Sequence, residues 1–238
     1  MIEKTTATSA RTLARRAYHH IRQDIVTGQL KAGSKLKLET LVHHYAIGMS
    51  PLREALARLV GDQLVKTEDQ RGFWVAPLSL EELDDISRVR KLIETEALSL
   101  SIERGDEAWA AGVREAFEAL SEVEKDATEP KPGISPPVDE WEERNGHFHL
   151  ALISACGSPW LIKLQDQLYH QAERYRHVSL SASRGRRFVH DEHQAIFDAA
   201  MERNALRACR LTEDHLMRTY ETVRNALARM QSEETEVA

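Results

Sequence analysis

The sequence predicts a mainly α-helical protein, in which an N-terminal winged helix-turn-helix is followed by an all-α bundle of six helices. Three observations predict it: two short amphipathic stretches separated by a glycine-containing joint, a β-prone hairpin after them, and six amphipathic segments without convincing strands in the remainder. The Pro77-Leu78-Ser79 stretch ends the hairpin and marks a domain boundary. The predicted domains are a winged helix-turn-helix domain at residues 11–78 and a helical domain at residues 79–231.

A helix is expected to begin at Ser50-Pro51. Serine is a good N-cap, and proline suits the first helical position because its fixed φ and missing N–H cost nothing there. The following apolar residues have the spacing that buries one helical stripe: Leu52, Ala55, Leu56, Leu59 and Val60. Arg53 and Arg58 fall off that stripe, so the outward face of this helix is basic.

A shorter apolar stripe ends at Tyr45, and Ala46-Ile47-Gly48 is the predicted joint between the two helices. A helix, a tight turn and a second helix with a positive outer face form a helix-turn-helix, whose second helix fits the major groove of DNA. The β-prone runs at 64–67 and 73–76 predict a wing, and its Arg71-Gly72 tip is suited to a minor groove.

An earlier helix is predicted over residues 14–25 and closed by Gly28, whereas residues 1–10 are expected to be disordered. The N-terminal 76 residues hold 12 Lys and Arg against 7 Asp and Glu, while the rest of the chain holds 20 against 31. The positive charge is therefore concentrated in the segment expected to meet phosphates.

No apolar run approaches the length of a membrane span or the core of a signal peptide, so we expect a cytoplasmic protein without a membrane partner. The two cysteines, Cys156 and Cys209, lack metal-like spacing and are expected to be small buried residues.

At these motifs the chain resembles the winged-helix domain of the GntR transcription-factor family across residues 11–78. The matching pieces are Tyr18-x-x-Ile21-Arg22, Gly28-x-Leu30-x-x-Gly33, Ser50-Pro51-Leu52-Arg53-Glu54-Ala55-Leu56-x-x-Leu59, Leu64-Val65 and Arg71-Gly72. The sequence departs from the family pattern at Met49, commonly arginine, and at Glu39, often basic. The resemblance implies that double-stranded DNA is bound through Ser50, Arg53, Arg58, Arg71 and Gly72.

Beyond residue 79, periodicity predicts helices at 80–104, 106–126, 139–156, 159–180, 185–203 and 205–231. The proline-rich stretch at 129–138 is expected to be an exposed connector, and residues 232–238 a loose acidic tail.

Polar side chains lie on apolar stripes of three of these helices. Asn145 and His149 are one helical turn apart, His193 lies near Ile196, and His215 follows Leu211 by four residues. Spacing alone leaves two interpretations open: an interior metal site built from several helices, or histidines that are hydrogen-bonded in the core.

This part of the chain resembles the all-helical effector-binding domain of the FadR-type branch of the GntR family, through Asn145-x-x-Phe148-His149, Glu192-His193-x-x-Ile196 and His215-Leu216. The resemblance implies a divalent metal ion, zinc first with nickel or manganese as alternatives, held by Asn145, His149, His193 and His215. Because the common aspartate is asparagine here, four neutral ligands leave the charge of the ion uncompensated, which favours an anionic metabolite.

Arg90 falls on the buried stripe of the first helix of this domain, and Arg90 with Glu94 matches the family pattern Arg-x-x-x-Glu. Two roles stay open for Arg90: an ion pair with Glu94, or a clamp for a small carboxylate effector together with the metal. Tyr169, Arg174 and Arg176 are further candidates for the effector site, most of them expected at the surface or in a dimer interface. The local sequence 47–56 resembles a branch that includes repressors of short dicarboxylate catabolism.

We therefore expect a metabolite-responsive regulator, a repressor that binds a pseudo-palindromic operator as a homodimer, because one winged helix contacts too few bases for specificity. The alternative is a metal-dependent hydrolase that uses the three histidines. Against it, the inward faces show no neighbouring carboxylate to act as general base except Glu192, which is expected to point elsewhere. A third interpretation is a helical interaction protein without a ligand.

Overall fold

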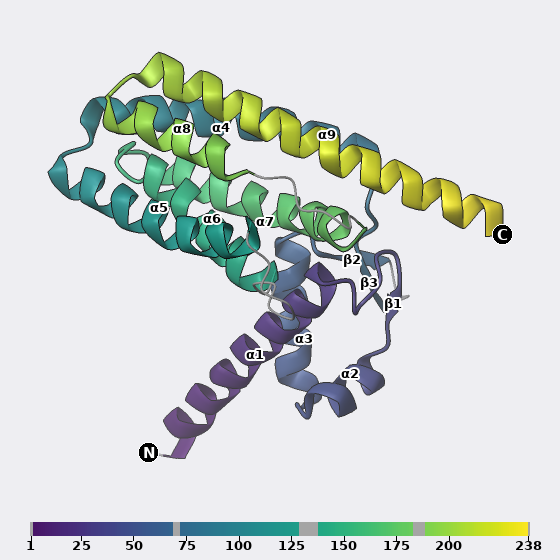
Figure 1. Ribbon diagram of the computed structural model, residues 1–238. Coiled ribbons are helices and arrows are strands. Elements are labelled where there is room, and N and C mark those ends of the chain that lie inside the picture. Colours follow the sequence, from purple (N-terminus) through teal and green to yellow (C-terminus); the bar gives the residue numbers. More distant parts are fainter. Residues whose placement is uncertain (1, 69–71, 129–137, 183–188, 238) are drawn as a thin grey trace. The chain divides into compact units, whose positions relative to one another are not determined.

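The protein consists of two compact units, Met1–Ser79 and Leu80–Ala238. The computed structural model describes residues 2–68, 72–128, 138–182 and 189–237, and Figure 1 shows the elements of both units. The boundary between the units lies one residue after the predicted division of the chain.

The N-terminal unit is a helix-turn-helix with a small antiparallel sheet (Figure 1). Its elements are α1 (Ile2–Val26), β1 (Lys35–Leu36), α2 (Leu38–Tyr45), α3 (Met49–Gly61), β2 (Val65–Glu68) and β3 (Gly72–Val75). The apolar stripe of α3 forms the centre of its core, since Leu52, Leu56 and Leu59 are fully buried together with Ile21 of α1. Residues 2–10, expected to be disordered, continue α1 toward the N-terminus instead.

The second helix of the motif starts earlier than expected. Its N-cap is Gly48, in an extended conformation without a side-chain cap, and Ser50 lies exposed in the first turn. The prediction that Ser50 caps the helix was therefore wrong, because the turn leaves α2 at Ala46 and needs only Ile47 and Gly48 to reach α3.

Ala46, rather than Gly48, carries the left-handed backbone of this turn, with φ of 49° and ψ of 46°. The N–H of Ile47 donates to the carbonyl of Val42 at 3.2 Å, which closes the end of α2 as a left-handed C-cap usually does.

We expect Ala46→Gly to raise the free energy of unfolding of the N-terminal unit by about 0.5–1 kcal/mol, because glycine adopts positive φ without the Cβ penalty. Ala57→Gly, in the exposed interior of α3, is the matched control and should lower it by a similar amount. Urea unfolding of the full chain followed by circular dichroism measures both, and a destabilised Ala46→Gly protein would contradict the expectation.

The sheet has the order β1-β3-β2 and is antiparallel throughout. The predicted hairpin is present as β2 and β3, whereas β1 was missed because two residues carry no periodic signal. Trp74 is the central position, since it pairs with Lys35 on one side and Lys66 on the other. The tip residue Arg71 lies outside the described residues, and Gly72 beside it has a φ of 107°.

The C-terminal unit is all-helical over its described residues (Figure 1). Its helices are α4 (Leu80–Arg104), α5 (Glu107–Thr128), α6 (Val138–Ile153), α7 (Pro159–Ala182), α8 (His190–Met201) and α9 (Ala205–Val237). The fold class is thus confirmed. Several other helix ends in this unit differ from the predicted ones by one to three residues. Helix α8 begins at His190, and the predicted residues 185–188 lie outside the described residues, while α9 runs through most of the expected acidic tail. The predicted proline-rich connector falls on residues 129–137, outside the described residues.

The helices pack around an apolar core that includes Trp109, Phe148, Leu152 and Ile196. Helix α4 packs along α9, and it also contacts α6 and α7 (Figure 1). Unlike an ordinary amphipathic helix, α4 buries two charged side chains, Arg90 and Glu94. Polar groups therefore lie inside the bundle, where they need partners.

Candidate functional site

Three histidines from three helices meet inside the C-terminal unit. His149 of α6, His193 of α8 and His215 of α9 each offer a ring nitrogen, and these three atoms lie within 4.8 Å of one another. All three side chains are buried, and His193 is fully enclosed. The structure thus brings together the predicted histidines, and this spacing fits three ligands of one ion.

Each histidine has a carboxylate behind it. The Nδ1 atom of His193 lies 2.8 Å from Glu124, and that of His215 lies 2.8 Å from Glu192. His149 Nδ1 is 3.8 Å from Glu94, an ion-pair distance rather than a hydrogen bond. The expectation that the histidines have no neighbouring carboxylate was wrong: Glu192 points at His215, and Glu94 and Glu124 reach in from α4 and α5.

The carboxylates are themselves held by further donors. Glu94 accepts from Arg90 Nε at 2.7 Å, and Glu192 accepts from Arg218 at 3.1 Å. Glu124 accepts from the indole of Trp141 at 3.2 Å and lies 3.1 Å from a ring nitrogen of His190. These contacts fix the carboxylates as acceptors, so they orient the rings in the way that outer-shell groups orient metal-ligating histidines.

A carboxylate at Nδ1 keeps the proton on that nitrogen and leaves the Nε2 lone pair available. In His193 the Nε2 atom is buried and has no hydrogen-bond partner among the described residues. Burial lowers the pKa of His149 well below its usual value, and the nearby His215, His193, Arg90 and Arg176 lower it further. Burial alone would raise the pKa of Glu124, but hydrogen bonds from His193, Trp141 and His190 hold it below its usual value. These shifts favour a neutral imidazole at His149 and an ionised carboxylate at Glu124.

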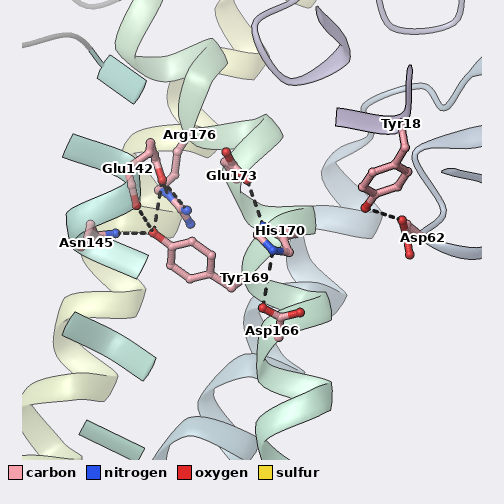
Figure 2. A network of polar contacts seen from close by, with 9 residues as sticks. All are labelled: Tyr18, Asp62, Glu142, Asn145, Asp166, Tyr169, His170, Glu173 and Arg176. Atoms are coloured by element: carbon pink, nitrogen blue, oxygen red, sulfur yellow. Dashed lines mark hydrogen bonds and ion pairs between the residues drawn. The ribbon is translucent and has the colours of Figure 1, made fainter. Parts of the chain in front are cut away.

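Asn145 lies one turn before His149 on α6. Its Nδ2 atom donates to the hydroxyl of Tyr169 at 2.8 Å (Figure 2). Its Oδ1 atom is buried without a hydrogen-bond partner in the described part of the chain. A buried carbonyl oxygen and a buried imidazole nitrogen, both lacking partners, fit a divalent cation with mixed nitrogen and oxygen ligands.

The predicted effector residues are buried rather than exposed at a surface: Arg90, Glu94, Tyr169 and Arg174, as well as Arg176. The predicted ion pair of Arg90 with Glu94 is present at 2.7 Å. The ring of Tyr169 has guanidinium groups 5.6 Å (Arg90) and 4.4 Å (Arg176) from its centroid.

Arg90 and Arg176 also line a cavity between α4, α7 and α9. The other lining residues are Leu83, Ser87, Ala172, Tyr175, Leu216, Thr219, Tyr220 and Val223. Neither Tyr169 nor Arg174 lines it. Burial lowers the pKa of Arg174, and the neighbouring Tyr175 and Glu82 partly offset that effect.

The candidate DNA-binding residues that are described lie in the N-terminal unit. Ser50 and Arg53 are exposed in the first half of α3, and Arg53 has no ion-pair partner among the described residues. Arg58 differs, because its guanidinium lies over the ring of Tyr18 at 4.4 Å. Tyr18 in turn donates to Asp62 at 2.7 Å (Figure 2). Arg58 therefore packs on a tyrosine of α1 whose own position is fixed by Asp62.

Comparison with known families identifies both units. The family model described as "Bacterial regulatory proteins, gntR family" matches residues 13–75, and the model described as "FCD domain" matches residues 85–218. The chain belongs to the GntR family. It is a DNA-binding transcriptional regulator with an FCD domain.

Relatives of this GntR regulator are similar over nearly the whole chain. The uncharacterized HTH-type transcriptional regulator BphR of Paraburkholderia xenovorans is 38% identical over 91% of this chain and 87% of its own length. The HTH-type transcriptional repressor GlaR of Escherichia coli is 35% identical over 89% of this chain and 96% of its own. Among solved structures, E. coli McbR/YncC superposes with a TM-score of 0.72 at 19% identity, covering 89% of this chain and 96% of that one.

These relatives are regulators rather than enzymes, so the hydrolase alternative is wrong. The carboxylates beside the histidines agree with this result, because each is engaged by other side chains, Glu192 by both His215 and Arg218. No helix in the described residues combines the length and apolar character needed to cross a bilayer.

Proposed function

We propose that the protein is a metabolite-responsive repressor, which binds a pseudo-palindromic operator as a homodimer and is released by a small carboxylate at a metal-containing cavity. The observation that carries the proposal is a buried cluster of three histidines, each backed by a carboxylate, in a chain that also has a winged helix. In this account the protein acts in the cytoplasm, where bacterial operator DNA is found.

The DNA-binding part of the proposal rests on the exposed N-terminal residues of α3, Ser50 and Arg53. Ser50 and Arg53 are available to phosphates and base edges, and Gly72 lies beside the tip of the wing. One such unit reads a short half-site, so two copies are needed for a specific operator. The relative GlaR is named a repressor, which supports the same sign of regulation here.

The metal-binding part of the proposal rests on Asn145, His149, His193 and His215. Three imidazole nitrogens with an amide oxygen suit zinc, with nickel or manganese as alternatives. When bound, the ion would supply a Lewis-acid centre for an anionic oxygen of the effector. Glu94, Glu124 and Glu192 contact the histidine rings rather than the proposed metal position, so they would partly compensate the charge of the ion without acting as ligands.

The effector part of the proposal rests on the cavity lined by Arg90 and Arg176, which the four proposed metal ligands do not themselves line. A buried guanidinium binds carboxylates well, and Arg90 uses Nε, not its terminal nitrogens, for Glu94. Glu94 contacts Arg90 and His149 at the same time, so an anion at Arg90 and the metal ligands share one carboxylate. This shared group gives effector and metal a direct route to influence each other.

A mobility-shift experiment tests the proposal. The full-length protein, loaded with zinc, should retard DNA from upstream of its own gene, and one of a panel of short mono- and dicarboxylates should release it. An Arg90→Ala protein should still retard the DNA but lose the response to the carboxylate. If the protein retards no upstream fragment at low salt, the proposed operator binding is refuted. If it retards the DNA but no carboxylate releases it, the proposed effector is refuted.

The outer carboxylates give a second expected result. Glu124→Gln removes the charge that orients His193, and we expect zinc affinity to fall by about tenfold or more. Glu122→Gln, an exposed change two residues earlier on α5, is the control and should leave affinity unchanged. Calorimetric zinc titration of both proteins makes the measurement, and equal affinities would show that the contact between Glu124 and His193 has no role in metal binding.

A further inference from the structure

A buried chain of hydrogen bonds leads from Asn145 to an ion pair between α6 and α7. Asn145 Nδ2 donates to the hydroxyl of Tyr169 at 2.8 Å. That hydroxyl lies 3.1 Å from the main-chain oxygen of Glu142 and 3.3 Å from its carboxylate. Arg176 donates to the same carboxylate through Nη2 at 2.7 Å and Nε at 2.9 Å (Figure 2).

The direction of each hydrogen bond follows from the chemistry of these groups. Both oxygens that Glu142 offers to the phenol are acceptors: one is a main-chain carbonyl, and the other belongs to the carboxylate that accepts two N–H groups of Arg176. The phenol of Tyr169 has a single proton to donate, and two acceptor oxygens of Glu142 lie within its reach. That proton is directed to Glu142, which leaves the phenol oxygen as an acceptor toward Asn145.

An acceptor at Tyr169 can face only the NH₂ end of the amide. The carbonyl end of Asn145 must therefore turn the other way, where Oδ1 is buried without a partner in the described residues. A buried acceptor of this kind is unfavourable unless something else binds it. Asn145 and His149 lie on the same face of α6, so a cation at the histidines is the group that suits this oxygen.

We propose that Tyr169 is a positioning residue, which holds the amide of Asn145 with its carbonyl oxygen toward the metal, while Glu142 and Arg176 set the direction of the phenol. This inference rests on the proposed metal site. Tyr169 then serves the metal through Asn145 and is not a direct contact of the effector, which agrees with its absence from the cavity lining. The need for it comes from asparagine, because an amide has two unlike ends and a carboxylate does not.

The test is metal binding by Tyr169→Phe in the full-length protein. The variant keeps the ring, with Arg90 and Arg176 near it, and removes only the hydroxyl. We expect affinity for Zn²⁺ to fall by about tenfold or more, the range typical for loss of an outer-shell group. The absorption bands of bound Co²⁺ should also change, because the oxygen ligand is no longer held. Tyr175→Phe, a buried tyrosine on the same helix whose hydroxyl contacts Glu82, is the control.

The deciding comparison repeats Tyr169→Phe in an Asn145→Asp background. Either oxygen of an aspartate can face the metal, so the hydroxyl is no longer needed for orientation. We expect the loss caused by Tyr169→Phe to shrink to less than about threefold in this background, so that the two positions show strong coupling.

Three results would overturn the inference. Unchanged zinc affinity in Tyr169→Phe would show that the hydroxyl has no positioning role, and equal losses with and without the Asn145→Asp change would show that its role is only structural. Failure of the unmodified protein to bind Zn²⁺ or Co²⁺ would remove the metal site itself and the inference with it. The first two results leave the proposed metal site intact, so the two failures are distinguishable.

Discussion

Arg53→Ala should lower affinity for the operator by on the order of a hundredfold or more, without loss of fold. Arg53 is exposed in the first half of α3 and has no ion-pair partner among the described residues, so its removal leaves the core of the unit unchanged. One arginine contact to a base contributes about 1–3 kcal/mol, and a dimer uses two copies. Fluorescence anisotropy with labelled operator DNA, at fixed salt, measures the loss.

Arg58→Ala is the matched comparison on the same helix. Arg58 lies over the ring of Tyr18, and five helical residues place it about 140° around the helix axis from Arg53. We expect a smaller loss of affinity, about tenfold or less, which is similar for operator and unrelated DNA because it reflects phosphate contact. If Arg58→Ala impaired operator binding more than Arg53→Ala, the assignment of α3's first half to the major groove would be wrong.

The helix-turn-helix could be predicted because its signals are local. The apolar stripe of α3 follows the helical period: four of its five predicted members are buried, and the fifth, Val60, is half-buried. The residue at which α3 begins was predicted less accurately. A Ser-Pro pair is a good helix start in isolation, but the left-handed turn at Ala46 sets the actual start at Met49.

Each histidine could be singled out because it lies on an apolar stripe of its own helix, and the resemblance to the family then joined the three into one predicted site. Their carboxylate partners could not. Glu124 and His193 are 69 residues apart in the sequence, and only packing of α5 against α8 brings them to 2.8 Å. Glu94 had been linked to Arg90 alone, because a spacing of four residues shows the ion pair but gives no sign of His149 on another helix.

The carboxylates change the electrostatic argument for the effector. Four neutral ligands by themselves leave the double charge of a metal ion uncompensated, and this reasoning predicted a strong preference for anions. Because Glu94, Glu124 and Glu192 lie behind the histidines, much of the charge of a bound ion would already be balanced. Selection of the proposed anionic effector would then depend more on Arg90 at the cavity than on the ion, so Arg90→Ala should affect carboxylate binding more than zinc binding.

Zinc should raise the melting temperature of the metal-free protein, and His193→Ala should abolish the effect. A ligand present at a hundred times its Kd stabilises the folded state by about 2.7 kcal/mol, which is about 5–10 °C for a chain of this size. His193 is fully buried with an Nε2 atom that lacks a partner in the described residues. Its loss should weaken zinc binding by at least about a hundredfold, more than is typical for outer-shell changes.

His190→Ala is the control that separates a metal ligand from its surroundings. His190 lies three residues earlier on α8 and contacts the same carboxylate, Glu124, at 3.1 Å, but it is not one of the three clustered histidines. Its removal takes away one of the three groups that contact Glu124, so its zinc response should fall far less than that of His193→Ala. His193→Gln, which keeps a polar side chain beside Glu124, guards against a general loss of folding. Differential scanning calorimetry measures the melting temperature of all four proteins with and without zinc. An equal zinc-dependent rise in all four, His193→Ala included, would show that zinc binds outside the histidine cluster.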